Sequence, residues 1–245
     1  MSRPSSNGQA ETHRMPGLPA VDLVAFDFDG VLCDSVDVKT QAFRALYADA
    51  GPGVQDALTA YHLAHGGVSR DHKIRYAEQT LLGRAGDAET VRARSAWFAE
   101  LVVDRVIAAP MLPGAMACLQ RLAGTRPVAV VSGTPEDELH RIVEAKGLAH
   151  LFDTVRGAPT DKATHLARLL AQYGARPGRT VMVGDALTDL AAADCCGTRF
   201  LGIRATDGGD PFPAGTRVED NLSGALEVFA ELVTANAGRS EGYER

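Results

Sequence analysis

Two aspartates one residue apart are the first side chains in the sequence whose spacing indicates chemistry. Asp27 and Asp29 stand in the stretch VAFDFDGVLCDS, at the end of an apolar run, and strand geometry would send both side chains to one face. Two carboxylates so close repel each other unless a cation neutralises them or one of them holds a proton. Both solutions indicate a functional site, whereas the simpler alternative is a polar turn in which Gly30 supplies backbone freedom.

A second pair of acids occurs in the stretch VGDALTDL, where Asp185 and Asp189 are four residues apart across a predicted strand-to-helix turn. Carboxylates at two strand ends could jointly hold a hard divalent cation, and Mg²⁺ is favoured because no cluster of His or Cys accompanies them. The alternative for Asp189 is an ordinary acid in the first turn of a helix, where the helix dipole favours it.

Two further stretches could bind an anion. In VVSGTPED, the hydroxyl of Ser132 and the amides that follow it, beginning with Gly133, could donate hydrogen bonds, although a Ser-Gly-Thr turn that caps a helix is the simpler alternative. In GAPTDKATHL, Lys162 begins a predicted helix, where its charge opposes the helix dipole at a small local cost. That cost invites a functional explanation, whereas an isolated exposed lysine is usually only solvated.

The segments that end at these polar groups are short apolar runs typical of buried strands. Helical patterns follow them, and Gly147 and Gly174 end two of these patterns. Strands that alternate with helices predict an α/β fold with a Rossmann-like parallel sheet, in which ligands bind at the carboxyl ends of the strands. The predicted strands are residues 21–28, 127–132, 179–185 and 198–204, and residues 222–232 form a closing helix.

Residues 36–109 do not follow this alternation of strands and helices, because they contain several helical patterns and no convincing strand. Ser35 is the predicted cap of a helix that runs through Ala50, and Ser69 is the predicted start of another that ends before Gly83. The segment is therefore predicted to be a small all-helical cap domain. The predicted layout is a disordered leader (1–19), an α/β core (20–35 and 110–235), the cap (36–109) and a loose tail (236–245).

The order of these motifs, DxDG, strand-end Ser, helix-start Lys and GDxxxD, resembles the haloacid dehalogenase-like hydrolase superfamily over residues 21–205. The sequence is similar in particular to the branch whose helical cap follows the first motif. The resemblance implies that Asp27 is a nucleophile that forms an aspartyl-phosphate, and that Asp29 is the general acid and then the general base. Asp29 must be protonated for the first role, and crowding beside Asp27 would favour this.

The resemblance also implies that Ser132, Gly133 and Lys162 bind the phosphoryl oxygens. Mg²⁺ would be held by Asp185 with the Asp27 carboxylate and the Asp29 backbone carbonyl, and Asp189 would be a ligand or would orient the metal-bound waters. Dehalogenation, the other chemistry of the superfamily, uses no metal and lacks the second aspartate. The intact acidic set therefore favours a Mg²⁺-dependent phosphatase.

The cap domain is expected to determine the substrate specificity. In HGGVSRDHK, Arg70 and its neighbour Ser69 could contact a second anionic or hydroxylated group, and the alternative is a helix start capped by Ser69. GVSR resembles the cap loop of β-phosphoglucomutase, which makes a phosphosugar mutase the rival function. Mutases place histidine where Lys39 stands and proline where Ala163 stands, so we expect hydrolysis of a small phosphosugar or phosphorylated short acid.

The composition sets outer limits on the function. The 245 residues carry 25 Lys and Arg against 31 Asp and Glu, for a formal net charge of −6, and no long basic cluster that would indicate nucleic-acid binding. No apolar run reaches the about 18 residues that cross a bilayer, so no membrane partner is expected. Four cysteines without CxxC spacing are expected to be reduced thiols in a cytoplasmic protein. The sequence indicates no oligomeric state. A catalytically silent family member that binds phosphate or a protein is the non-enzyme alternative.

Overall fold

The computed structural model describes residues 21–205, 209 and 211–235. The predicted leader (1–19) and tail (236–245) lie outside the described residues.

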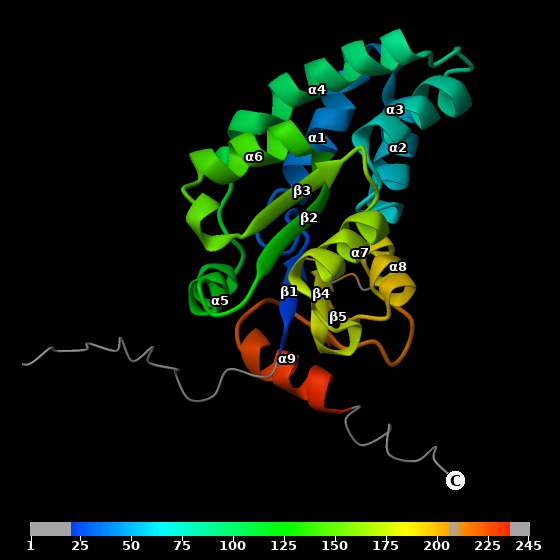
Figure 1. The fold of residues 1–245 in the computed structure, drawn as a ribbon. Helices are drawn as coiled ribbons and strands as arrows, with labels where there is room; N and C mark the ends of the chain where they lie inside the picture. Colours follow the sequence, from blue (N-terminus) through cyan, green and yellow to red (C-terminus); the bar gives the residue numbers. More distant parts are fainter. Residues whose placement is uncertain (1–20, 206–208, 210, 236–245) are drawn as a thin grey trace, which may run out of the picture.

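A six-stranded parallel sheet forms the centre of the molecule (Figure 1), in the order β3-β2-β1-β4-β5-β6. β1 is flanked by β2 and β4, with Val24 opposite Val128 on one side and Val181 on the other. Because strand side chains alternate, the two faces of β1 enter different parts of the core. The strands are β1 (Leu23–Phe26), β2 (Val128–Pro135), β3 (Thr154–Ala158), β4 (Thr180–Gly184), β5 (Arg199–Ile203) and β6 (Val218–Glu219).

Helices cover both faces of the sheet. On one face Leu23 and Ala25 pack with side chains of α7 and α8, and on the other Val24 and Phe26 belong to a cluster with side chains of α5, α6 and α9. The ring of Phe229 in α9 meets that of Phe26 edge to face, with centroids 6.3 Å apart. The bounds are α5 (Ala115–Leu122), α6 (Glu136–Ala145), α7 (Lys162–Tyr173), α8 (Leu187–Cys196) and α9 (Ala225–Thr234).

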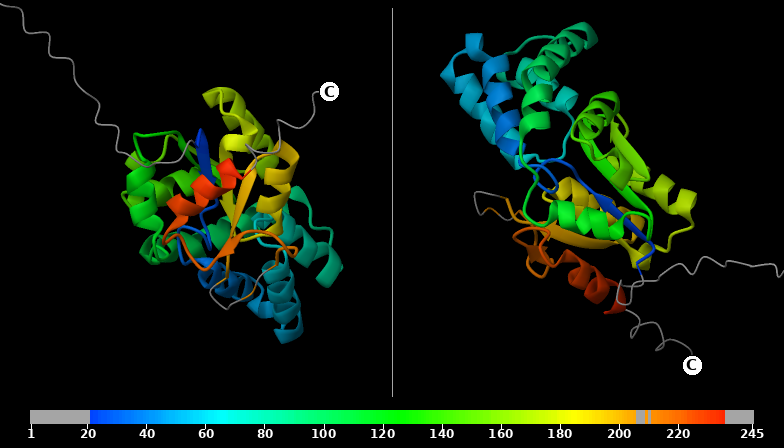
Figure 2. Two further views of the ribbon diagram at one scale, coloured as in Figure 1. Left: turned by 90° about the horizontal axis from the view of Figure 1, so that it is seen from below. Right: turned by 90° about the vertical axis from the view of Figure 1, so that its left-hand side faces the viewer.

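Four helices between β1 and α5 form an all-helical cap at one end of the sheet (Figures 1 and 2). Phe43 and Phe98 join two of them, with ring centroids 4.5 Å apart, and both belong to the same apolar cluster as Phe26 of the sheet. The cap is thus continuous with the core through buried apolar side chains. Its helices are α1 (Val36–Leu46), α2 (Pro52–Ala64), α3 (Arg70–Tyr76) and α4 (Ala88–Ala108).

The structure confirms the predicted α/β fold with a parallel core and a helical cap, and it corrects several local predictions. The helix predicted from Ser35 through Ala50 ends at Leu46 and is followed by a separate short 3₁₀ helix. The helix predicted from Ser69 changes after Tyr76 into a π-helical turn at Ala77–Leu81. Strands β3 and β6 and helix α5 were not predicted, and all three are short, with five, two and eight residues. Among the described residues no helix is long and apolar enough to cross a membrane.

Candidate active site

The carboxyl ends of β1, β2 and β4 open into a cavity of about 790 Å³ between the core and the cap. Asp27, Ser132 and Asp185 line it from the core, and Arg70 and Lys73 line it from the cap. The predicted positions therefore meet at one edge of the sheet, as expected for ligand sites in parallel α/β folds.

A buried ion-pair cluster lies at the base of this cavity. Lys162, the first residue of α7, places its Nζ 3.0 Å from Asp27 Oδ2 and 2.6 Å from Asp189 Oδ1, and all three side chains are buried. Burial acts to lower the pKa of Lys162, but the charges of Asp189 and Asp27 outweigh it and raise that pKa. Lys162 is therefore a fixed positive charge beside Asp27, which explains why a lysine stands at an unfavourable helix start.

Three carboxylates converge at the same point. Asp27, Asp185 and Asp189 each offer one oxygen, and these oxygens lie within 4.8 Å of one another. Desolvation, followed by the charges of Asp27 and Asp189, raises the pKa of Asp185 well above its ordinary value. Burial likewise raises the pKa of Asp189 to about 7, although Lys162 opposes this rise. This crowding is what a divalent cation would relieve, and an all-oxygen donor set suits a hard ion such as Mg²⁺.

The three carboxylates are not equivalent as ligands. Asp27 Oδ1 is buried and has no hydrogen-bond partner among the described residues, so it is free to bind a cation or attack an electrophile. Asp189 accepts from Lys162 at one oxygen and from the backbone N–H of Ala186, at 3.2 Å, at the other. The geometry thus favours Asp27 and Asp185 as direct ligands, and Asp189 as the residue that positions Lys162.

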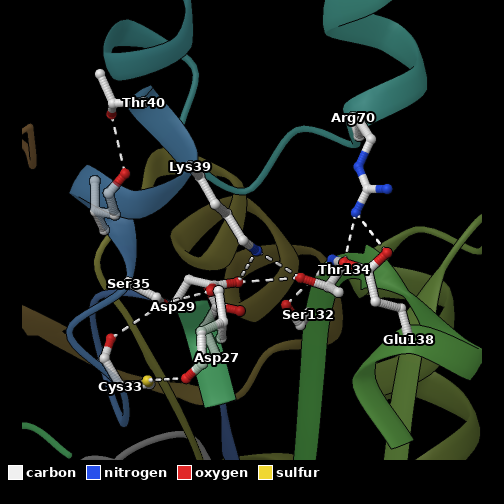
Figure 3. A network of polar contacts seen from close by, with 12 residues as sticks. Asp27, Asp29, Cys33, Ser35, Lys39, Thr40, Arg70, Ser132, Thr134 and Glu138 are labelled. Atoms are coloured by element: carbon white, nitrogen blue, oxygen red, sulfur yellow. Dashed lines mark hydrogen bonds and ion pairs between the residues drawn. The ribbon is translucent and has the colours of Figure 1, made fainter. Parts of the chain in front are cut away.

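Asp29 lies in a separate polar network (Figure 3). Lys39 of α1 donates to Asp29 Oδ2 at 2.5 Å, Ser35 donates to Oδ1 at 2.6 Å, and Thr134 donates to Oδ2 at 3.1 Å. Lys39 also donates to Thr134 Oγ1 at 2.7 Å, which closes the network between the cap and β2. Asp29 is therefore held by cap and core together.

This network reverses the protonation expected for Asp29. Burial acts to raise the pKa of Asp29, but the charge and hydrogen bond of Lys39, with the donors Ser35 and Thr134, bring it below the ordinary value. The argument that crowding beside Asp27 would keep Asp29 protonated is therefore wrong for this structure. Three donors now stabilise the ionised form.

The sequence did not identify Lys39 and Thr134 as partners of Asp29. Ser35 precedes α1 and was predicted to cap it, but its side chain makes no capping hydrogen bond and donates to Asp29 instead. The available signal was the spacing of Ser35 and Lys39, four residues apart and therefore on one face of the helix start. Thr134 follows the predicted Ser132 by two residues on β2.

Two of the predicted phosphate-binding residues, Ser132 and Gly133, line the cavity beside this cluster. Ser132 is buried and its hydroxyl accepts the Thr134 N–H at 3.2 Å, which leaves the hydroxyl proton for a ligand. Gly133 has no room for a side chain, since a Cβ there would lie 2.5 Å from the carbonyl oxygen of Gly67 in the cap. Gly30 has a φ of +77°, and a Cβ there would lie 2.2 Å from Asp185 Oδ2. Both glycines allow close approach around the site.

Arg70 joins the cap to the core. Its Nη2 lies 2.6 and 2.7 Å from the two carboxylate oxygens of Glu138 in α6 (Figure 3). Its Nη1 donates to the carbonyl of Ser95 at 2.9 Å. The guanidinium also lies over the ring of Phe98, 4.5 Å from its centroid. Its terminal nitrogens are thus engaged by protein, although Arg70 lines the cavity as predicted. Ser69 stands at the start of α3 without a side-chain cap hydrogen bond.

A parallel α/β core, a helical cap after the first strand and acidic residues at the strand ends are together typical of one class of hydrolases. The family model for haloacid dehalogenase-like hydrolases matches residues 21–197. The chain belongs to this family, and within it to the phosphatase branch.

The relatives with similar sequences include a phosphatase and a protein named as a kinase. The chain is 32% identical to phosphoglycolate phosphatase of Rhodospirillum rubrum over 71% of its length and 76% of that protein. It is 30% identical to the tyrosine-protein kinase PtkA of Mycobacterium tuberculosis over 70% of its length and 58% of that protein. The structure of β-phosphoglucomutase from Clostridium difficile shares the fold, with a TM-score of 0.69 at 16% identity, over 89% of this chain and 100% of that chain.

Replacing Asp185 should separate metal binding from folding. The raised pKa means that ionised Asp185 costs stability at neutral pH, so Asp185→Asn should raise the Tm of the metal-free protein and abolish the Tm increase caused by Mg²⁺. A gain of about 1 kcal/mol corresponds to ~2–4 °C for a chain of this size. Calorimetry with EDTA and with Mg²⁺ checks this, and Asp194→Asn, an exposed acid of α8, is the control. An unchanged Mg²⁺ response in Asp185→Asn would contradict the proposed ligand set.

Proposed function

We propose that this protein is a Mg²⁺-dependent hydrolase of small phosphomonoesters that acts through an aspartyl-phosphate on Asp27. The observation that supports it best is the buried Asp27 carboxylate, which lines the cavity and has one oxygen held by Lys162, while the other oxygen has no hydrogen-bond partner among the described residues. A nucleophile needs one unhindered oxygen in a fixed position, and phosphoryl transfer needs positive charge beside it.

In the first step Asp27 Oδ1 forms a bond to phosphorus while the bond from phosphorus to the leaving oxygen breaks. Lys162 and the Ser132 hydroxyl hold the phosphoryl oxygens during this transfer. Asp29, in its protonated form, gives its proton to the leaving oxygen, so an alcohol departs.

In the second step a water attacks phosphorus and the bond to Asp27 breaks. Asp29 is now ionised and accepts the proton of that water, which releases inorganic phosphate and regenerates both acids. The three donors around Asp29 favour this ionised form, so the network of Lys39, Ser35 and Thr134 suits the second step better than the first.

Magnesium would be held by Asp27, Asp185 and the backbone carbonyl of Asp29, and when bound it supplies positive charge for the phosphoryl oxygens. Asp189 would act through Lys162 and through the ordering of metal-bound water. These assignments rest on the crowded all-oxygen cluster.

The substrate is proposed to be a small phosphorylated metabolite, either a phosphosugar or a phosphorylated short acid, enclosed in the cavity under the cap. The phosphoglycolate phosphatase relative favours a short acid. The β-phosphoglucomutase structure shares the fold at only 16% sequence identity, and Lys39 stands beside Asp29 where the mutases are expected to have histidine. We therefore propose hydrolysis in preference to a mutase or a catalytically silent protein.

We also propose that residues 36–109 form a cap domain on a core of residues 20–35 and 110–235. A cytoplasmic location is proposed because all four cysteines are free in the structure.

A phosphate-release assay tests the proposed function directly. With Mg²⁺ the protein should hydrolyse p-nitrophenyl phosphate and one or more phosphorylated metabolites, and Asp27→Asn should lower kcat by at least ~10³-fold because no other carboxylate replaces the nucleophile. Asp194→Asn is the control. If no phosphorylated metabolite is turned over, the proposal that this protein is an enzyme is contradicted. If β-glucose 1-phosphate is converted to glucose 6-phosphate without release of free phosphate, the protein is a mutase instead.

Lys39 should set the pH range of the first step. Lys39→Met removes the cation that lowers the pKa of Asp29, so that pKa should rise and Asp29 should stay protonated to higher pH. The leaving oxygen of an alkyl phosphate needs a proton. For such a substrate, the pH above which kcat falls should therefore be higher in Lys39→Met than in the wild type. This pH should move less for p-nitrophenyl phosphate, whose leaving group needs no proton. A downward shift in Lys39→Met would contradict this role.

A further inference from the structure

Lys73 of α3 is a buried cation without a carboxylate partner. Arg70, Lys73 and Lys162 are the buried basic side chains within the described part of the chain. Arg70 pairs with Glu138, and Lys162 pairs with Asp27 and Asp189. No ion pair to Lys73 is found among the described residues, although a buried charge is costly unless it is paired and hydrogen-bonded.

The polar partner of Lys73 is His62 of α2. The Lys73 Nζ lies 2.8 Å from His62 Nδ1 and 3.4 Å from the carbonyl oxygen of His62. Burial, with the charge of Lys73, lowers the pKa of His62 to about 3, so the ring is neutral. Because Nδ1 accepts from the ammonium, the ring proton is on Nε2, which is buried and has no partner among the described residues.

Both side chains line the cavity that contains Asp27. The charges that act on Lys73 come from the floor and walls of that cavity: Lys39 and Lys162 lower its pKa, and Asp29 and Asp185 raise it. Burial has the largest effect, and the pKa of Lys73 falls to about 7. An anion bound in the cavity would supply the missing counter-charge and restore the ammonium form.

We propose that Lys73, positioned by His62, forms a subsite for a carboxylate of the substrate, at the cap side of the cavity in which Asp27 receives the phosphoryl group. The Lys73 ammonium is held by His62 Nδ1 and lines the cavity, and its single positive charge matches the single negative charge of one carboxylate. A second phosphate would need more positive charge, and the guanidinium of Arg70 is already engaged by Glu138. The subsite rests on the proposed phosphatase function and selects a phosphorylated short acid over a phosphosugar.

A matched pair of substrates tests the subsite. In 2-hydroxyethyl phosphate a hydroxymethyl group replaces the carboxylate of 2-phosphoglycolate. The wild type should prefer 2-phosphoglycolate, and Lys73→Met should lower the ratio of the two kcat/KM values by at least ~30-fold, since the carboxylate loses its counter-charge. A ratio cancels any shared loss of folded enzyme. Arg75→Met, which removes an exposed cation of the same helix, should leave the ratio unchanged.

The pH dependence gives a second readout. The preference of the wild type for 2-phosphoglycolate should be greatest below pH about 7 and should fall above it, because Lys73 loses its proton there. Lys73→Met should lose this dependence. A ratio that is the same in the wild type and in Lys73→Met, at every pH, would overturn the subsite.

Binding separates a failed subsite from a failed phosphatase. In Asp27→Asn protein, calorimetry should show that 2-phosphoglycolate binds more tightly than 2-hydroxyethyl phosphate, and that adding Lys73→Met removes the difference. If the wild type hydrolyses neither ester but this difference is found, the phosphatase proposal fails and the subsite stands. If both esters are hydrolysed and bind equally, the subsite fails alone.

Discussion

The buried ion pairs of Lys162 with Asp27 and Asp189 are the interaction on which the rest of the site depends. Asp27 ends the central strand and Asp189 lies in the first turn of α8, so one ammonium group connects two strand ends of the sheet. Lys162 thus supplies positive charge at a point where three carboxylates converge and repel one another. With that charge, Asp27 keeps one oxygen fixed and the other free, which is the requirement for a nucleophile.

The two aspartates of the DxDG motif have different neighbours, and this difference suits them to different proposed roles. Asp27 faces Lys162 and the acidic cluster, whereas Asp29 faces Lys39 of the cap helix α1 and Thr134 of β2. Cap and core both supply donors to Asp29, and Arg70 and Glu138 connect them a second time. In the proposed mechanism the proton transfers of Asp29 therefore depend on the position of the cap, which also carries the proposed carboxylate subsite at Lys73.

The sequence predicted which core residues would lie close together, because they follow apolar strands and stand in motifs with fixed spacing. Asp27, Ser132, Lys162 and Asp185 could be placed together from the rule that parallel strands end at one edge. The partners Lys39, Glu138 and His62 could not, since each depends on how the cap helices pack against the core. The protonation of Asp29 was wrong for the same reason: spacing shows which acids are near each other, but not which cations lie beside them. The short strands β3 and β6 were not predicted from the sequence, because few of their side chains are buried in a regular alternation.

The most direct measurement of the central claim is a rapid acid quench of a single turnover with a ³²P-labelled phosphomonoester and Mg²⁺, followed by peptide mapping. The account predicts transient label on an acyl phosphate at Asp27, labile to hydroxylamine, which persists longer in Asp29→Asn because water is no longer deprotonated there. Label on another side chain, or phosphate released at the full rate with no protein-bound label at any time, would contradict it.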